Sequence, residues 1–277
     1  KQSTEFELRK GIINVCLPAI LFITFMNMDL NSKYFLVILI SFLLQVLLLS
    51  LGVLIKKIKI FAHPLIPFIV SGCTFGLLGI SLYGTVFGIE KLGKISILGV
   101  GHELFIWFVY ITYMRISLSK KSLSLNTFKT FIRSPIIIGI FLGMSLNMIG
   151  ISDWFQKNLI TAGIYETLNY LGCLATPLIL IVVGYGLKFN MKYMKKSVLF
   201  LSLRLVITLS IGYLVKLLII DRLIVNDIYF DYAFFTFIIL PPPLSMSLFA
   251  GEFGNEELKE LANNTTVLSI VVSVIAF

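Results

Sequence analysis

Two segments of the chain resemble each other across a separation of 166 residues. SLYGTVFGIEKL begins at Ser81, SLFAGEFGNEEL begins at Ser247, and six of the twelve aligned positions are identical. A second pair, PAILFI from Pro18 and PLILIV from Pro177, has a similar offset of 159 residues. A chance match between apolar segments is the alternative, but two matches at similar offsets argue against it. The sequence therefore predicts two copies of one unit of roughly 160 residues, as in proteins built from structural repeats.

The composition indicates that these units lie in a bilayer. Hydrophobic residues make up 58% of the chain and charged residues 13%, and the mean hydropathy is +0.97. A helix that crosses a bilayer needs about 20 consecutive apolar residues. The three cysteines lie in apolar stretches and there are two histidines, so no zinc site, disulfide framework or other cofactor is expected. We predict an all-α polytopic membrane protein.

Hydropathy divides the chain into nine predicted spans joined by short connections. The longest polar stretch, at residues 115–129, is expected to be a solvated linker between the repeats. The predicted spans are 11–30, 34–55, 64–88, 92–114, 130–150, 164–189, 197–220, 232–251 and 258–277.

Nine spans do not divide into equal halves, because four fall in the first copy and five in the second. The unpaired span is 130–150, whose counterpart would lie before Lys1. We therefore expect a first helix that precedes this sequence, which gives two five-helix units. An odd number of spans in each unit makes the two copies insert with opposite topology, as an inverted repeat. Residues 1–277 would form a single transmembrane unit.

The basic residues predict the orientation in the plasma membrane. Sixteen lysines and arginines fall on one side and five on the other, and the richer side is expected to be cytoplasmic. That side includes the loops at 56–63, 115–129 and 188–196, which places Phe277 outside the cell. The net charge of +9 is then mostly an insertion signal, and no nucleic-acid partner is expected.

Two of the spans contain residues that a regular helix does not tolerate well. In span 64–88, the run from residue 71 to residue 84 contains four glycines among small polar residues, and span 232–251 contains the triplet 241–243, which is Pro-Pro-Pro. Proline lacks an N–H and its ring clashes with the preceding turn. The 166-residue offset aligns residues 75–77 with this triplet. We therefore predict two broken helices that cross, because freed backbone groups at membrane depth need partners inside the protein. Close packing of helices at the glycines is the alternative for span 64–88.

The predicted substrate site lies at this crossing. Ionisable residues inside a membrane are candidates for function, so His102 or Glu103 would bind substrate or relay a proton, with a structural contact between helices as the alternative. Arg204 could attract an anion, but snorkelling to the interface is the favoured interpretation. Asn264 could contact substrate or simply pack at the start of the last span. The predicted substrate-binding residues are Thr74, Gly76, Ser81, His102, Glu103, Pro241, Pro242, Ser245 and Asn264.

Three stretches together resemble the auxin efflux carrier family, which includes plant PIN-type carriers and bacterial malonate and malate permeases. The stretches are 74–82 followed by Phe87 and Gly88, 241–243 followed by 249–250 and 253–254, and 177–187 with Gly184. Members of that family usually have Asn where this chain has Thr74, and Pro where it has Ser81. Because both departures fall in the presumed site, the substrate is expected to differ from those of the better-known members.

The resemblance implies ten helices arranged as in sodium–proton antiporters and bile acid symporters. Residues 8–31 and 127–190 would form a scaffold. Residues 34–115 and 197–277 would form a core that holds both broken helices and moves like an elevator. The substrate would be a small organic anion, either auxin-like or a carboxylate. A proton or a sodium ion is the candidate coupling ion, and a homodimer is the candidate assembly.

Three classes of function compete at this stage. A secondary transporter is favoured by the repeats, the paired breaks and the family pattern. A transporter-like receptor or sensor is the first alternative. An intramembrane enzyme is the second, but it would have to use His102 and Glu103, the one pair that offers acid–base chemistry. We expect no enzyme activity.

Overall fold

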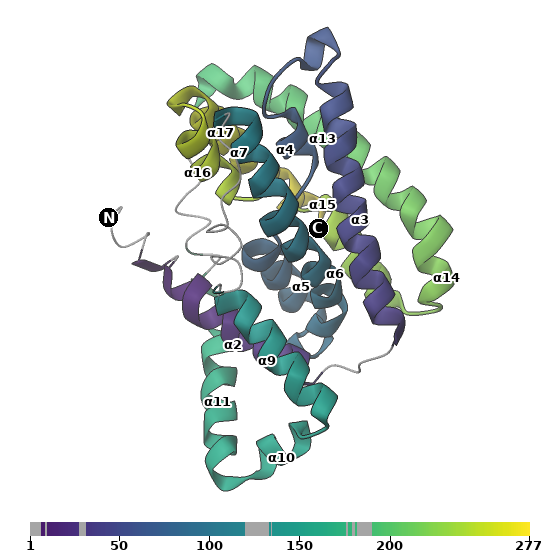
Figure 1. The fold of residues 1–277 in the computed structure, drawn as a ribbon, viewed down its shortest axis with the longest axis vertical. Helices are drawn as coiled ribbons and strands as arrows, with labels where there is room; N and C mark the ends of the chain where they lie inside the picture. Colours follow the sequence, from purple (N-terminus) through teal and green to yellow (C-terminus); the bar gives the residue numbers. More distant parts are fainter. Residues whose placement is uncertain are drawn as a thin grey trace.

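The structure is a computed structural model that describes residues 7–8, 10–27, 32–119, 133, 135–175, 177–178, 181 and 190–277. Every regular element in these residues is helical (Figure 1). Five helices are long and apolar enough to cross a membrane: Lys33–Ile55, Ile66–Phe87, Ile89–Leu118, Met191–Leu223 and Glu256–Ala276. Three shorter apolar helices are Asn14–Met26, Ile138–Ile149 and Ile228–Ile239. The predicted all-helical fold is confirmed, and the five long apolar helices agree with a membrane protein.

The two halves of the core contain corresponding helices in the same order. The first half contains α3 (Ser32–Ile55), α4 (Ile66–Val70), α5 (Ile80–Phe87), α6 (Leu92–Phe105) and α7 (Ile111–Ser119). The second half contains α13 (Met194–Val215), α14 (Asp221–Leu223), α15 (Ile228–Ile239), α16 (Ser245–Phe253) and α17 (Glu256–Ala276). With the 166-residue offset, α3, α4, α5 and α6 overlap α13, α15, α16 and α17. Four helices are extended by π-helical turns at Ile12–Cys16, Phe75–Gly79, Ile106–Tyr110 and Lys216–Ile220.

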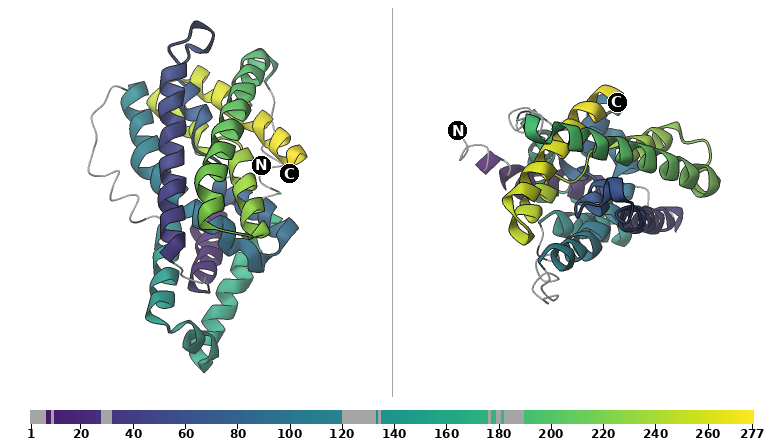
Figure 2. Two further views of the ribbon diagram at one scale, coloured as in Figure 1. Left: turned by 90° about the vertical axis from the view of Figure 1, so that its right-hand side faces the viewer. Right: turned by 90° about the horizontal axis from the view of Figure 1, so that it is seen from above.

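A separate group of helices, named the scaffold group below, falls within the ranges 8–31 and 127–190. Helix α2 (Leu17–Met26) packs against α9 (Pro135–Ile149) and α11 (Leu159–Cys173), and α10 (Ser152–Lys157) lies between the latter two in the chain. Figures 1 and 2 show this group at one end of the molecule, below the core helices. Gly139 allows the close approach, because a Cβ there would lie 2.6 Å from the carbonyl oxygen of Pro18. Small residues at the contact between two helices are typical of helix pairs in membranes.

The core is held together by helices from both halves. Helix α6 packs against α3 and α15, and α17 packs against α13 and α16. Large side chains such as Phe68, Tyr83, Tyr110 and Phe237 are fully buried between them. This interior surrounds α4 and α15, and the C-terminal ends of both helices are buried in it.

Two predicted boundaries are wrong. Helix α7 continues through Arg115 to Ser119, so the start of the predicted linker is helical, because Leu118 packs against the core. Helix α11 begins at Leu159 and not at residue 164, because the side chain of Asn158 accepts a hydrogen bond from the Ile160 N–H at 3.1 Å and caps the helix. Most of the predicted span after residue 175 lies outside the described residues.

Candidate functional site

Both predicted helix breaks are present. Helix α4 ends at Val70, residues 71–74 are not helical, and a π-helical turn from Phe75 leads into α5. Gly72 has a φ of 67°, a conformation that glycine adopts without strain. Helix α15 ends at Ile239, and residues 240–244 separate it from α16. The proline triplet explains this second break, since it removes three donors from the helix.

The two breaks contact each other directly. The N–H of Thr74 donates to the carbonyl oxygen of Pro241 at 2.8 Å, and the Thr74 hydroxyl donates to that of Pro242 at 2.6 Å. The predicted proximity of residues 74–76 and 241–243 is confirmed. Thr74 and Pro241 are almost equivalent positions at the 166-residue offset.

Side chains from neighbouring helices accept hydrogen bonds from the free N–H groups of the first break. The Gly72 N–H donates to the side-chain oxygen of Gln45 at 2.8 Å, and the Cys73 N–H donates to Nε2 of His102 at 2.9 Å. An accepting Nε2 carries no proton, which puts the proton of a neutral imidazole on Nδ1. That atom lies 3.6 Å from the Glu103 carboxylate. His102 therefore fixes the shape of the break, as the structural alternative predicted.

Arg204 of α13 bonds to both breaks. Its guanidinium donates to the carbonyl oxygens of Ile69 at 2.5 Å, Gly72 at 2.9 Å and Leu240 at 2.7 Å. The residue is 3% exposed. The favoured sequence interpretation, snorkelling to the interface, is wrong. The reason is that the carbonyls left free by two broken helices provide partners that a continuous bundle lacks.

The other carbonyls of the second break are also bonded. The Ser273 hydroxyl donates to the oxygen of Ile239 at 2.6 Å, and the Met246 N–H donates to that of Pro243 at 2.9 Å. Sequence reasoning missed both Ser273 and Gln45. Gln45 did leave a signal, because it is a lone amide within a long apolar run.

Three further predicted site residues lie near the breaks without joining them. A Cβ on Gly76 would be 3.4 Å from Leu17 of α2, so this residue faces the scaffold group. The hydroxyl of Ser81 is buried and donates to the carbonyl oxygen of Leu77 at 3.0 Å. Ser245 is half-buried at the first position of α16.

Asn264 lies in a different polar cluster. Its side chain accepts from the N–H of Asn190 at 2.7 Å and donates to the hydroxyl of Ser197 at 3.0 Å. Ser197 precedes Arg204 by seven residues on α13, or roughly 10 Å at 1.5 Å per residue. The structure thus separates Asn264 from the crossover and gives it the packing contacts that were the alternative.

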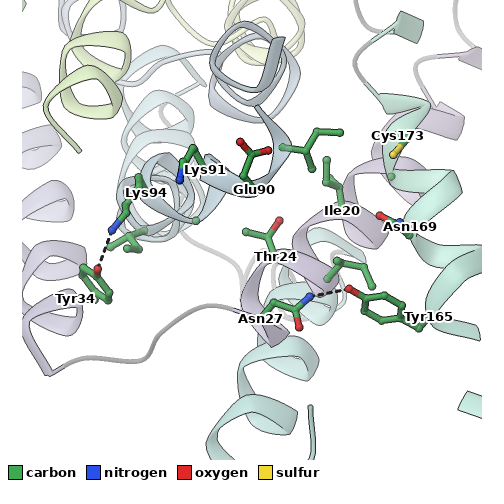
Figure 3. Close-up of a pocket in the computed structure, with 15 residues that line it drawn as sticks. Ile20, Thr24, Asn27, Tyr34, Glu90, Lys91, Lys94, Tyr165, Asn169 and Cys173 are labelled. Carbon is green, nitrogen blue, oxygen red and sulfur yellow. Dashed lines mark hydrogen bonds between the residues drawn. The ribbon is translucent and has the colours of Figure 1, made fainter. Parts of the chain in front are cut away.

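A cavity of about 600 Å³ lies between the scaffold group and the start of α6 (Figure 3). Its polar lining comes from both groups, and none of the predicted site residues lines it. The lining residues are Ile20, Ile23, Thr24, Asn27, Tyr34, Ile89, Glu90, Lys91, Gly93, Lys94, Ile97, Tyr165, Asn169, Gly172 and Cys173.

The two lysines of this cavity have different partners. The Lys94 ammonium pairs with the Asp227 carboxylate at 2.7 Å and donates to the Tyr34 hydroxyl at 3.3 Å. Burial opposes the charge on Asp227, but the hydrogen bond and charge of Lys94 together with backbone N–H donors outweigh it, so the pKa of that carboxyl lies below its usual value. The Lys91 ammonium lies 4.8 Å from the centre of the Tyr229 ring. The cavity therefore contains the Lys91 ammonium and the Glu90 carboxylate in addition to the Lys94 ion pair.

Comparison with known proteins gives no assignment, since no protein-family model and no curated protein matches the chain. Among the described residues, no group of three or more His, Cys, Asp or Glu side chains is arranged to hold a metal ion.

Proposed function

We propose that this protein is a secondary transporter that moves a small organic anion across the plasma membrane by alternating access. The observation that carries the proposal is the pair of helix breaks that meet through Thr74, Pro241 and Pro242 inside an apolar helical protein. Irregular backbone at membrane depth is tolerated inside protein or beside a water-filled cavity. Broken helices that meet in this way form the substrate sites of repeat-built transporters.

The packing supports an elevator-like motion of the core against the scaffold. The α2–α9–α11 group contacts the core mainly through α6, and the cavity of Figure 3 lies at this junction. Gly76, in the π-helical turn that follows the first break, presents a surface without a side chain to Leu17. Such a surface allows sliding, whereas a bulky residue there would obstruct it. Gly76→Leu is therefore expected to stop transport.

Three features favour an anionic substrate. The half-helices that begin at Phe75 and Ser245 both start at the crossover, and helix N-termini attract negative charge. The buried guanidinium of Arg204 adds positive charge beside them. Lys91 adds a second cation, in the cavity between core and scaffold.

The proposed topology is an inverted repeat with the loops at 56–63, 115–129 and 188–196 in the cytoplasm. The cavity that contains Lys91 would then lie toward the extracellular side. In a background without the three native cysteines, Lys121→Cys and Lys195→Cys should resist an impermeant thiol reagent applied outside the cell. Lys33→Cys, on the opposite side, should react. Labelling of the first two alone would reverse the topology.

The central test is flux in proteoliposomes. Labelled small carboxylates, one aromatic and one dicarboxylate, should accumulate in vesicles that contain the protein and not in empty ones. Lys91→Gln should raise the KM by roughly three- to tenfold, as expected when an anion loses about 1 kcal/mol of charge-assisted contact. Lys157→Gln is the matched control, because that lysine is exposed and pairs only with Asp153 on the same short helix. Absence of flux for every acid, or equal effects of the two substitutions, would contradict the proposal.

A further inference from the structure

Carbonyl oxygens from both helix breaks converge on one point of the crossover. Those of Ile69 and Gly72 come from the end of α4 and the first break, and that of Leu240 comes from the end of α15. The C-terminal end of a helix carries partial negative charge and unpaired carbonyls. Unwound carbonyls and half-helix C-termini of this kind coordinate sodium in other transporters built from repeats.

In this protein the point is occupied by the chain itself. The guanidinium of Arg204 donates to all three oxygens, and the side chain is buried. Within the part of the chain that the structure describes, no carboxylate lies within ion-pair distance of it. The two half-helix C-termini therefore provide the counter-charge.

We propose that Arg204 is a built-in cation that fills the crossover's cation site, so that this protein needs no sodium there. The absence of a sodium requirement in transport rests on the proposed function. The occupancy of the site by Arg204 does not depend on that function. A guanidinium keeps its proton in a protein, so the charge is permanent and neither enters nor leaves during a cycle. Its donors also form a fixed planar fork, which holds the two breaks at one spacing.

The site can be emptied by Arg204→Ala and refilled from solution. In the purified full-length chain this substitution should lower the Tm by roughly 10 °C, since it leaves three buried carbonyls without donors. Millimolar guanidinium chloride should restore more than half of that loss in the variant and should leave the Tm of the unsubstituted protein unchanged. Arg222→Ala is the control, because Arg222 is exposed on α14, and it should show neither loss nor recovery.

Two further measurements cover the other outcomes. If Arg204→Ala does not fold, Arg204→Lys keeps the charge but has a single ammonium, and guanidinium should then have no effect on its Tm. Flux of the unsubstituted protein should be the same in sodium as in choline medium. A tenfold or greater loss of flux in choline, or no recovery of Arg204→Ala by guanidinium, would overturn the proposal. Absence of all flux together with recovery of the Tm would instead refute the transport function and leave the occupied site standing.

Discussion

The two helix breaks solve the same problem in opposite ways. The first break keeps its N–H groups and therefore needs acceptors, which Gln45 and His102 supply. The second break is built from prolines, which have no N–H, so it needs donors for its carbonyls. Arg204 and Ser273 supply two of these. One break thus satisfies its backbone donors with side-chain acceptors, whereas the prolines of the other break have no such donors.

The difference shows that two helix breaks in one protein can be stabilised by different kinds of group. An unpaired backbone group costs several kcal/mol in hydrocarbon. Each half must therefore bond or remove every group that its break frees. Thr74 links the two breaks, because its N–H and its hydroxyl donate to the carbonyls of Pro241 and Pro242. The two breaks are consequently expected to respond differently to substitution.

The largest effect is expected at Gly72 in the first break. A Cβ there would lie 2.9 Å from Pro243 and 3.1 Å from Ile106, and the φ of 67° is unfavourable for alanine. Gly72→Ala should therefore reduce stability by roughly 2–5 kcal/mol, the sum of the conformational and steric costs. Thermal unfolding in detergent measures this.

The control is Gly163→Ala in α11, where no atom lies within 4 Å of the added Cβ. Alanine is a better helix former than glycine by about 0.5–1 kcal/mol, so this variant should be slightly more stable. Equal losses in the two variants would show that the first break is not specially constrained.

The next effect is expected from removing an acceptor. His102→Leu leaves the buried N–H of Cys73 without a partner and should cost about 1–3 kcal/mol, and Gln45→Leu should do the same for Gly72. Ser96→Ala in the same helix is the control, because its buried hydroxyl has no partner among the described residues. That variant should keep its stability. Loss of stability in Ser96→Ala but not in His102→Leu would contradict the account of the first break.

The sequence predicted the breaks better than the groups that bond to them. Gly72 and the proline triplet are local signals, and the 166-residue offset aligned residues 75–77 with the triplet. Their partners come from α3, α6, α13 and α17, and no spacing in the sequence states which side chain will reach a given carbonyl. Arg204 is the clearest case, because an arginine near a membrane surface usually extends to water. Its burial follows from three carbonyls that exist only after the fold has formed.

Only some of the residues named from the sequence lie together in the structure. Thr74, Pro241, Pro242 and His102 do meet at the crossover. Asn264 belongs to a packing cluster instead, because Asn190 and Ser197 reach it first. The cavity next to Lys91 was missed, since it forms between helices that are distant in the sequence.

A smaller effect is expected from the link between the breaks. Thr74→Val removes the hydroxyl that donates to Pro242 but keeps the N–H that donates to Pro241. The expected cost is about 0.5–1.5 kcal/mol, the usual worth of one hydrogen bond. Thr74→Ser keeps the hydroxyl and should retain most of the stability. If valine and serine give the same Tm, the hydroxyl does not join the breaks.

The smallest effect on stability is expected at Pro242, in the break whose prolines lack N–H groups. Pro242→Ala adds one N–H to a break that has no acceptor reserved for it. The carbonyl of Ile238, four residues earlier, would be its partner in a regular helix, so α15 can lengthen and bond the new group. The Tm should then change by less than about 1 °C, which corresponds to roughly 0.5 kcal/mol for a chain of this size. Flux should nevertheless fall several-fold, because a longer α15 draws the carbonyl of Pro242 away from Thr74.

Pro135→Ala is the control, since this proline begins α9, where a missing N–H breaks no helical bond. It should leave both Tm and flux unchanged. Unchanged flux in Pro242→Ala would mean that the second break does not depend on the missing N–H of Pro242.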